Sequence, residues 1–245
     1  MIVSEVMTTQ LVTVTPNDSL SHAAGLLRQH QFHHLPVVRP IYRHETSNSW
    51  PVLEGLITSN DIDLAVGVGN EKSINSEQRP WEEQRVAEVM NRSIMRVTPT
   101  TSVAAAAQLL VERGLNCLPV VEYEESLNTE QDFEYEARTF LVGLLTRSDL
   151  LIELARILGA FEPGMDLLIP LPTGDQTSLA KLLLLAAELH TKVDSVIVAP
   201  PKKGVPHVAT VRIGTINPAP LLVRLQQAGI SYSFANFQSE RDTHA

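Results

Sequence analysis

The chain has 245 residues, of which 44% are hydrophobic and only 5% aromatic, so its core must be built mainly from aliphatic side chains. A formal net charge of −9 disfavours a protein that spreads along the phosphate backbone of a nucleic acid. The single Cys117 excludes an intrachain disulfide, no signal segment opens the chain, and the longest apolar run, Leu182 to Ala187, is too short to cross a bilayer. We therefore expect a cytoplasmic protein with neither nucleic acid nor membrane as a partner.

An internal repeat is the most informative feature of the sequence. Residues 3–38 align without a gap with residues 86–121, and 16 of the 36 aligned positions are identical. Average residue usage would give about two or three identities by chance. After a middle section of different length, the copies share a second motif, G-h-h-T-x-x-D, at residues 55–61 and 143–149. The repeat predicts two copies of one structural unit.

Each copy predicts the order helix, strand, helix, strand, strand, helix. A short opening helix leads to an extended segment that ends in V-T-P, where proline disfavours a continuing helix. An amphipathic helix follows, and L-P-V-V and the run into the glycine of the second motif predict two buried strands. The apolar stripe of the amphipathic helix consists of Leu20, Ala23, Ala24 and Leu27 in the first copy and Val103, Ala106, Ala107 and Leu110 in the second.

The segments between the two strands differ in charge. The segment from Val38 to Gly55 carries Arg39, Arg43 and His44, whereas the longer one from Val121 to Gly143 is acidic, and each is interpreted as a solvated hairpin. Gly, Ser and Pro residues predict a linker at residues 69–84, which separates copies at residues 1–68 and 85–158.

The last third of the chain predicts a different unit at residues 165–238. Strands are expected at 167–171, 195–200, 207–213 and 230–237. Thr177 or Ser178 is expected to cap a first helix, and Asn217-Pro218 to begin a second. The order βαββαβ indicates a split ferredoxin-like fold, so the whole chain is of the α/β (α+β) class.

The G-h-h-T-x-x-D motif allows two interpretations. Its carboxylate stands at the start of a helix and can accept hydrogen bonds from the neighbouring hydroxyls of a ribose, while the helix N-terminus favours an anion. Thr-x-x-Asp before an apolar helix is also a capping box, which needs no ligand. The two interpretations are compatible, and the motif alone does not decide between them.

The motifs together, V-x-E-V-M, V-T-P-x-x-S, L-P-V-V and G-h-h-T-x-x-D, each present twice, resemble a tandem pair of CBS domains over residues 1 to 158. The resemblance implies adenosine-type ligands in clefts between the copies. It implies that the Asp holds the ribose diol, the Thr helps at the sugar or phosphate, residues just before L-P-V-V reach the phosphates, and residues in and beside V-T-P lie near the base. The positions marked in this way are Thr13, Thr15, Pro16, His33, His34, Leu35, Pro36, Thr58 and Asp61 in the first copy, and Arg96, Thr98, Pro99, Asn116, Cys117, Leu118, Pro119, Thr146, Arg147 and Asp149 in the second.

The copies differ at the implied phosphate position. The first has the basic pair His33-His34, whereas the second has the uncharged pair Asn116-Cys117. Arg147 is a candidate for the missing charge, and an exposed turn without a ligand is the alternative for the histidines.

The terminal βαββαβ unit resembles an ACT domain, a small effector-binding or dimerising fold. Residues 172–179 replace the Pro-Gly-x-Leu turn of amino-acid-binding ACT domains by a longer loop, so dimerisation is the expected role. A second dimer contact is expected at the helix after Asp149, whose apolar stripe is Leu150, Leu154, Ile157 and Leu158. The whole arrangement resembles stand-alone bacterial CBS-ACT regulatory proteins, including the acetoin-utilisation type.

The sequence contains no nucleophile elbow, no P-loop and no His/Cys cluster at metal-ligand spacing, so neither an enzyme nor a metal site is expected. The expected function is a regulatory sensor that binds AMP, ADP, ATP, S-adenosylmethionine or NAD without a catalytic cofactor. We expect it to form a homodimer and to signal to a separate, unidentified effector protein. The alternatives are a scaffold or dimerisation protein with empty clefts and a transcription regulator.

Overall fold

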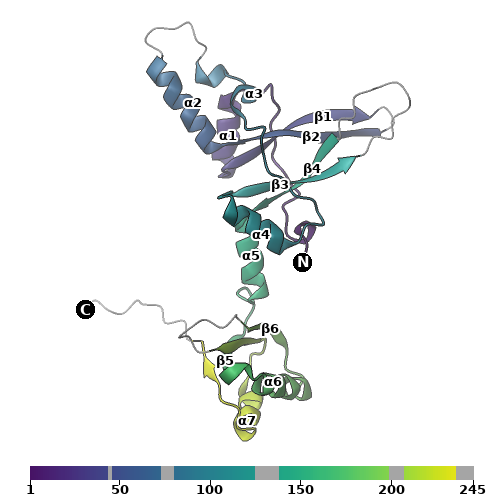
Figure 1. The fold of residues 1–245 in the computed structure, drawn as a ribbon, viewed down its shortest axis with the longest axis vertical. Helices are drawn as coiled ribbons and strands as arrows, with labels where there is room; N and C mark the ends of the chain where they lie inside the picture. The colour runs from purple at the N-terminus through teal and green to yellow at the C-terminus, as the bar shows by residue number, and fades with distance from the viewer. Residues whose placement is uncertain (44–45, 73–79, 125–137, 199–206, 236–245) are drawn as a thin grey trace, which may run out of the picture. The chain divides into compact units, whose positions relative to one another are not determined.

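The computed structural model describes residues 1–43, 46–72, 80–124, 138–198 and 207–235. The chain forms two compact units, Met1–Leu150 and Leu151–Ala245 (Figure 1). A four-stranded sheet lies in each unit.

The first unit holds both copies of the repeat and ends within helix α5. Its elements in chain order are η1 (Val3–Glu5), α1 (Leu20–His30), β1 (His34–Arg43), β2 (Thr46–Thr58), α2 (Ser59–Lys72), η2 (Trp81–Glu83), α3 (Val86–Val89), α4 (Val103–Glu112), β3 (Cys117–Glu124), β4 (Arg138–Thr146) and α5 (Arg147–Ile157).

The sheet of the first unit joins the two copies. Its strand order is β1-β2-β4-β3, and all neighbouring strands are antiparallel. The central strands β2 and β4 meet at Val52 and Phe140, and the ring of Trp50 contacts that of Phe140 edge-on, with centroids 5.6 Å apart. The two predicted strands per copy are confirmed. The hairpin expected between Val38 and Gly55 is present, and its strands β1 and β2 extend farther than the sequence predicts.

The helices α1 and α4 begin at equivalent serines. Ser19 accepts a hydrogen bond from the His22 backbone N–H, and Ser102 accepts one from Ala105, each over 3.2 Å. The amphipathic stripe of the first copy is confirmed, since all four of its residues are buried in the core under the sheet.

The opening segments are exchanged between the copies. Val3 donates its backbone N–H to the Thr101 carbonyl and packs in the core of the second copy, while Val86 donates to Asp18 and packs in the core of the first. The first-copy opening helix is only a 3₁₀ turn. The extended segments that end in V-T-P form single bridges, such as Val14 with Val37, instead of the predicted strands.

The predicted linker at 69–84 is partly wrong. Helix α2 continues to Lys72, and Trp81 in the turn η2 packs against the first-copy core. Residues 73–79 lie outside the described residues.

The second unit has the predicted βαββαβ order. Its elements are β5 (Met165–Pro170), η3 (Pro172–Gly174), α6 (Thr177–Glu188), β6 (Val193–Val198), β7 (Val208–Ile213), α7 (Ala219–Gln227) and β8 (Ser233–Phe234). The strands are antiparallel in the order β6-β7-β5-β8, which is the split ferredoxin-like arrangement. Apolar residues of α6 and α7 pack on the sheet in one core. The fold is confirmed, and its relation to ACT domains stays a prediction.

Two local details of the second unit differ from the sequence prediction. Helix α6 is preceded by Asp175, whose Oδ1 accepts hydrogen bonds from the Thr177 backbone and hydroxyl, so neither Thr177 nor Ser178 is the cap. The last strand spans only Ser233–Phe234 instead of 230–237, and residues 236–245 lie outside the described residues. Helix α7 begins at Ala219 after Pro218, one residue later than predicted, and Asn217 Oδ1 accepts a hydrogen bond from the Ala219 backbone N–H.

Candidate functional site

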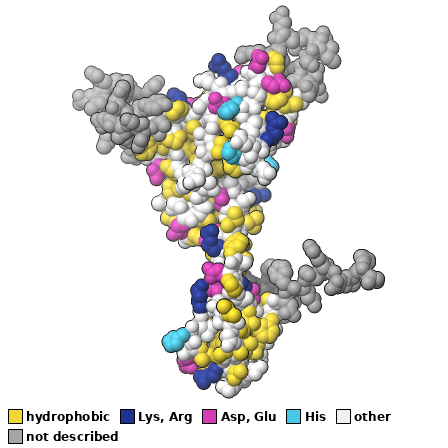
Figure 2. Space-filling view, turned by 180° about the vertical axis from the view of Figure 1, so that it is seen from behind, with side chains coloured by type: hydrophobic (Ala, Val, Ile, Leu, Met, Phe, Trp, Pro, Cys, Tyr) yellow, Lys and Arg dark blue, Asp and Glu magenta, His cyan; other side chains and the backbone are white. Residues whose placement is uncertain are grey.

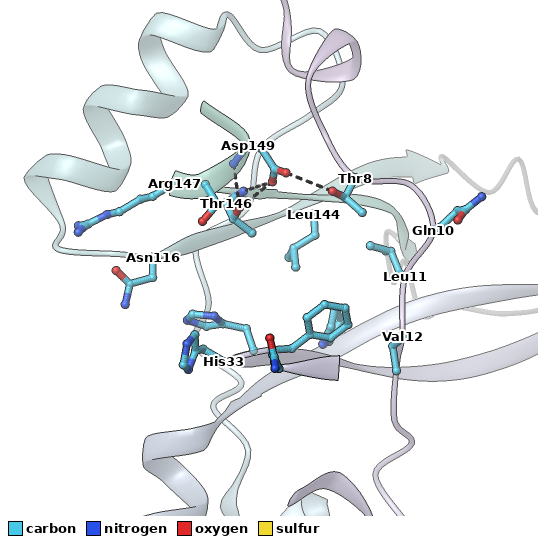
Figure 3. Close-up of a pocket in the computed structure, with 15 residues that line it drawn as sticks. Thr8, Gln10, Leu11, Val12, His33, Asn116, Leu144, Thr146, Arg147 and Asp149 are labelled. Atoms are coloured by element: carbon cyan, nitrogen blue, oxygen red, sulfur yellow. Dashed lines mark hydrogen bonds between the residues drawn. The ribbon is translucent and has the colours of Figure 1, made fainter. Parts of the chain in front are cut away.

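A pocket of about 430 Å³ lies within the first unit and draws on both copies of the repeat (Figure 3). This volume is in the range of small-molecule sites. The pocket is lined by Thr8, Gln10, Leu11, Val12, Gln31, Phe32, His33, His34, Pro36, Asn116, Leu144, Thr146, Arg147, Ser148 and Asp149.

Asp149 is held at one wall by the end of β4. Its Oδ2 accepts hydrogen bonds from the backbone N–H and the hydroxyl of Thr146, each over 2.7 Å. The backbone N–H of Asp149 donates back to the Thr146 hydroxyl over 3.2 Å. This is the reciprocal capping arrangement, and it fixes the carboxylate at the start of α5.

Thr8 reaches the same carboxylate from the exchanged opening segment. Its hydroxyl donates a hydrogen bond to Asp149 Oδ1 over 3.2 Å. Paired backbone hydrogen bonds of 2.9 Å with Leu144 hold Thr8 against β4. The exchange of opening segments therefore places a first-copy side chain on a second-copy motif, as Figure 3 shows.

Histidine lies across the pocket from Asp149. In Figure 3, His33, just before β1, is on the wall opposite Asp149 and Thr146, with Leu144 directed between them. His34 also lines the pocket. Burial is the main cause that lowers the pKa of His34 below 6.5; the nearby His33 lowers it further, and Asp61 acts in the opposite direction. The lowered pKa favours the neutral form of His34 at neutral pH.

Arg147 contributes less charge to the pocket than its position in the motif predicts. Its guanidinium donates to the Leu110 carbonyl over 3.3 Å at the end of α4, and Figure 3 shows the side chain directed away from Asp149. Its backbone N–H donates to the Asn116 carbonyl. Arg147 is therefore a rim residue in this structure.

The rest of the wall is mostly apolar. Leu11 and Val12 come from the extended segment before V-T-P, and Phe32 and Pro36 flank the two histidines. Such side chains can cover the faces of a flat ring, while the polar groups sit at opposite ends of the pocket.

The structure brings seven of the sequence-predicted residues to this pocket, namely His33, His34, Pro36, Asn116, Thr146, Arg147 and Asp149. The others do not line it. Leu35 and Leu118 are fully buried in the cores, and Cys117 is buried with its thiol pKa raised to about 12 by desolvation. Thr15 and Thr98 hold turns through their backbone N–H groups, and Arg96 donates to Thr139. Thr13, Pro16, Pro99 and Pro119 also lie outside the pocket lining.

In the first copy, Thr58 and Asp61 form the same capping hydrogen bonds as Thr146 and Asp149 in the second. Asp61 Oδ2 accepts from the Thr58 backbone over 2.8 Å and from its hydroxyl over 2.7 Å. Neither residue lines the pocket described above. Their role in a second cleft stays a prediction.

Sequence reasoning missed Thr8, Gln10, Leu11, Val12, Gln31, Phe32, Leu144 and Ser148. Residues 8–12 follow the V-x-E-V-M motif, whose packing on the other copy is not visible in a linear alignment. Leu144 and Ser148 stand inside the G-h-h-T-x-x-D motif, and that position was the available signal for them.

Within the described ranges, no three His, Cys, Asp or Glu side chains are grouped so that they could hold a metal ion. The same ranges contain no helix that is both long and apolar enough to cross a membrane.

The sequence pattern of the CBS domain matches residues 3–67 and 86–156, more than half of the chain. The chain belongs to the CBS domain family. The CBS domain-containing protein YhcV of Bacillus subtilis is 32% identical over 120 residues, which are 49% of this chain and 72% of YhcV. Residues beyond 156 lie outside the family match, so membership in the family does not identify the βαββαβ unit.

The solved structures that are similar to the chain include two further CBS proteins. A Vibrio cholerae protein assigned to acetoin utilization, AcuB, is 22% identical, with a TM-score of 0.45, over 66% of this chain and 98% of that protein. The CBSX2 protein, solved in complex with AMP, is 26% identical, with a TM-score of 0.45, over 64% of this chain and 98% of CBSX2.

Proposed function

We propose that this chain is a non-enzymatic regulatory sensor that binds an adenine nucleotide or a related adenosyl ligand in the pocket of its CBS pair. One observation carries the proposal: the Asp149 acceptor and His33 lie on opposite walls of one pocket, which His34 also lines, with apolar side chains between them. A nucleotide offers a sugar diol, a phosphate and a flat base, and each has a chemically matching group here.

The ligand would lie with its ribose at Asp149 and its phosphate toward His33 and His34. A carboxylate only accepts hydrogen bonds, so it suits hydroxyl donors and repels a phosphate placed beside it. The base would then pack against the apolar side, where Leu11 and Val12 lie. The uncharged Asn116 at the equivalent position of the second copy can add a hydrogen bond but no charge.

The output of the sensor would go to a separate effector protein in the cytoplasm. We propose that the sensor is a homodimer. Leu154, Ile157 and Leu158 of the predicted α5 stripe are exposed, as are Leu151 and Ile152 beside them. Hydrophobic side chains are visible on α5 and on the surface of the second unit in Figure 2. A second copy of the chain would cover such an apolar helix face.

A thermal-shift panel with AMP, ADP, ATP, S-adenosylmethionine and NAD tests the proposal. A ligand present at about 100 times its Kd stabilises the folded state by about 2.7 kcal/mol. We expect at least one ligand to raise the melting temperature, and the Asp149→Ala variant to lose that increase. A flat panel would contradict the sensor and favour a scaffold with empty clefts, and retention on DNA at physiological salt would favour a transcription regulator.

A further inference from the structure

Because of its hydrogen bonds within the protein, the carboxylate of Asp149 has fewer free acceptor sites than the sequence predicts. Oδ2 already accepts from both the backbone and the hydroxyl of Thr146, each over 2.7 Å. A carboxylate offers about two acceptor sites on each oxygen, so Oδ2 is fully used. Two neighbouring ligand hydroxyls therefore cannot bind one to each oxygen of Asp149.

Thr8 changes what the remaining oxygen can do. Its hydroxyl lies 3.2 Å from Asp149 Oδ1. Because an ionised carboxylate has no proton to give, Thr8 must be the donor in this pair, and one acceptor site on Oδ1 stays open. The Thr8 oxygen, having donated its single proton, keeps its own lone pairs for accepting.

We propose that Thr8 is a specificity-determining residue that, together with Asp149, recognises a vicinal diol. One ligand hydroxyl donates to Asp149 Oδ1 and its neighbour donates to Thr8 Oγ1, two acceptors held 3.2 Å apart. The assignment rests on the proposed function, because it describes how an adenosyl ligand is held.

The second copy provides the internal comparison. Asn91 is the equivalent of Thr8 and makes the same paired backbone hydrogen bonds, with Leu56 in place of Leu144, at 2.9 Å. Its side chain differs, since Asn91 Oδ1 accepts from the Ser93 backbone N–H over 2.9 Å. The threonine acceptor is therefore a property of the Asp149 pocket and not of the repeat.

Calorimetry on the full chain with adenosine, 2′-deoxyadenosine and 3′-deoxyadenosine tests the proposal, with the Asp61→Ala background used to remove any contribution of the first-copy motif. The wild-type chain should bind both deoxynucleosides more weakly than adenosine. Loss of the ligand hydroxyl that binds the carboxylate should lower the affinity by about tenfold or more, and loss of the hydroxyl that binds Thr8 should lower it by roughly threefold to tenfold. Thr8→Val keeps the shape of the side chain without its hydroxyl. It should lose the discrimination against one deoxynucleoside and keep it against the other, while Thr8→Ser keeps both. Asn91→Val is the matched control and should change neither ratio.

The outcomes separate this inference from the proposed function. If the wild-type chain binds none of the three nucleosides, the proposed adenosyl site is wrong, and the assignment of Thr8 is wrong with it. If adenosine binds and Thr8→Val keeps both ratios, only the role of Thr8 is overturned, and the Thr146 hydroxyl becomes the second acceptor. Tighter adenosine binding by Thr8→Val would also overturn it, because Thr8 would then compete with the ligand for Asp149.

Discussion

Gly143 lies so close to the Met7 side chain that a Cβ on Gly143 would overlap the Met7 sulfur. Gly55 stands in the same relation to the other exchanged segment, where a Cβ would be 2.8 Å from the Asn91 carbonyl oxygen and 3.0 Å from the Met90 sulfur. The glycine that begins each G-h-h-T-x-x-D motif therefore lets the opening segment of the other copy approach the strand. The same approach places Thr8 on Asp149.

Replacing either glycine by alanine should destabilise the first unit, and Gly55→Ala should cost more than Gly143→Ala. The Asn91 carbonyl is backbone and is bonded to Leu56, whereas the Met7 side chain can turn away. Overpacking a filled site costs about 1 to 3 kcal/mol, so we expect Gly55→Ala near the upper end and Gly143→Ala near the lower end. Chemical denaturation monitored by circular dichroism measures both.

The Met7→Ala variant supplies the control for this pair. Because it removes the side chain that the new methyl group meets, Gly143→Ala should cost less in the Met7→Ala background than in the wild type. Additive costs would show that the close approach to Met7 is not the cause.

The fold of the first unit could be predicted from the repeat in the sequence. The exchange of the opening segments between the two copies could not. The Leu20 to Leu27 stripe and the L-P-V-V strand are local patterns, and they appear in the structure as predicted. The sequence around Val3 and Val86 does not indicate whether each side chain packs in the core of its own copy or in the core of the other copy. The pocket residues Thr8, Gln10, Leu11 and Val12 were missed for this reason.

Removing the carboxylate of Asp149 should weaken adenosyl-ligand binding without unfolding the chain. A hydrogen bond to a charged group contributes about 1.5 to 3 kcal/mol, so Asp149→Ala should lower the affinity at least about tenfold. Isothermal titration calorimetry with the best ligand of the panel measures the change.

Asp61→Ala is the matched variant, because Asp61 makes the same capping hydrogen bonds with Thr58 and lies outside the pocket lining. Both substitutions remove the same cap, so their effects on the melting temperature should be similar. If Asp149→Ala and Asp61→Ala both left the affinity unchanged, the motif would serve only as a helix cap. A loss with Asp61→Ala alone would place the ligand at the first-copy motif.

The preference for phosphorylated ligands should depend on pH through His34. Burial holds the pKa of His34 below 6.5, and a phosphate beside it favours the protonated form. The affinity for AMP relative to adenosine should therefore rise as the pH falls from 8 to 6. Calorimetry in two buffers of different ionisation enthalpy should also detect proton uptake on AMP binding, and the His33→Ala/His34→Ala double variant should abolish both effects. Equal losses for AMP and adenosine in that variant would indicate packing instead of charge recognition.

The same shift sets the sign of the ligand-free pH dependence. The unfolded chain protonates His34 at its ordinary pKa, whereas the folded chain resists protonation. Well above pH 6.5, His34 is therefore unprotonated in both states and does not make the free energy of unfolding depend on pH. As the pH falls through 6.5 toward the lowered pKa, the unfolded chain takes up the proton first, so the free energy of unfolding decreases. A His34→Gln variant should lose less stability than the wild type between pH 7.5 and pH 5.5 in denaturation measurements.

Cys117 should be unreactive in the folded protein. Its side chain is 5% exposed, and burial raises the pKa of its thiol to about 12, so almost no thiolate forms at pH 8. Labelling with a thiol reagent should be complete in denaturant and negligible without it. Rapid labelling of the native chain would mean that the β3 end opens. Cys117, just before L-P-V-V in the second copy, is therefore a neutral, buried group. The sequence alone does not distinguish such a buried thiol from a side chain that contacts a ligand.

The exposed face of α5 should make the chain a dimer. Leu154 is 51% exposed and Ile157 45% exposed, although both belong to an apolar stripe. Light scattering at micromolar concentration should give a mass near twice that of the 27.0 kDa chain. The Leu154→Glu/Ile157→Glu variant should have the mass of one chain, because each new charge would be desolvated in an apolar interface without a partner. Val111 on α4 is 74% exposed, so Val111→Glu is a control that changes an apolar surface residue on another helix and should leave the mass unchanged. A wild-type mass near 27.0 kDa would rule out the dimer, and a dimer that survives deletion of residues 160–245 would show that the α5 face is sufficient.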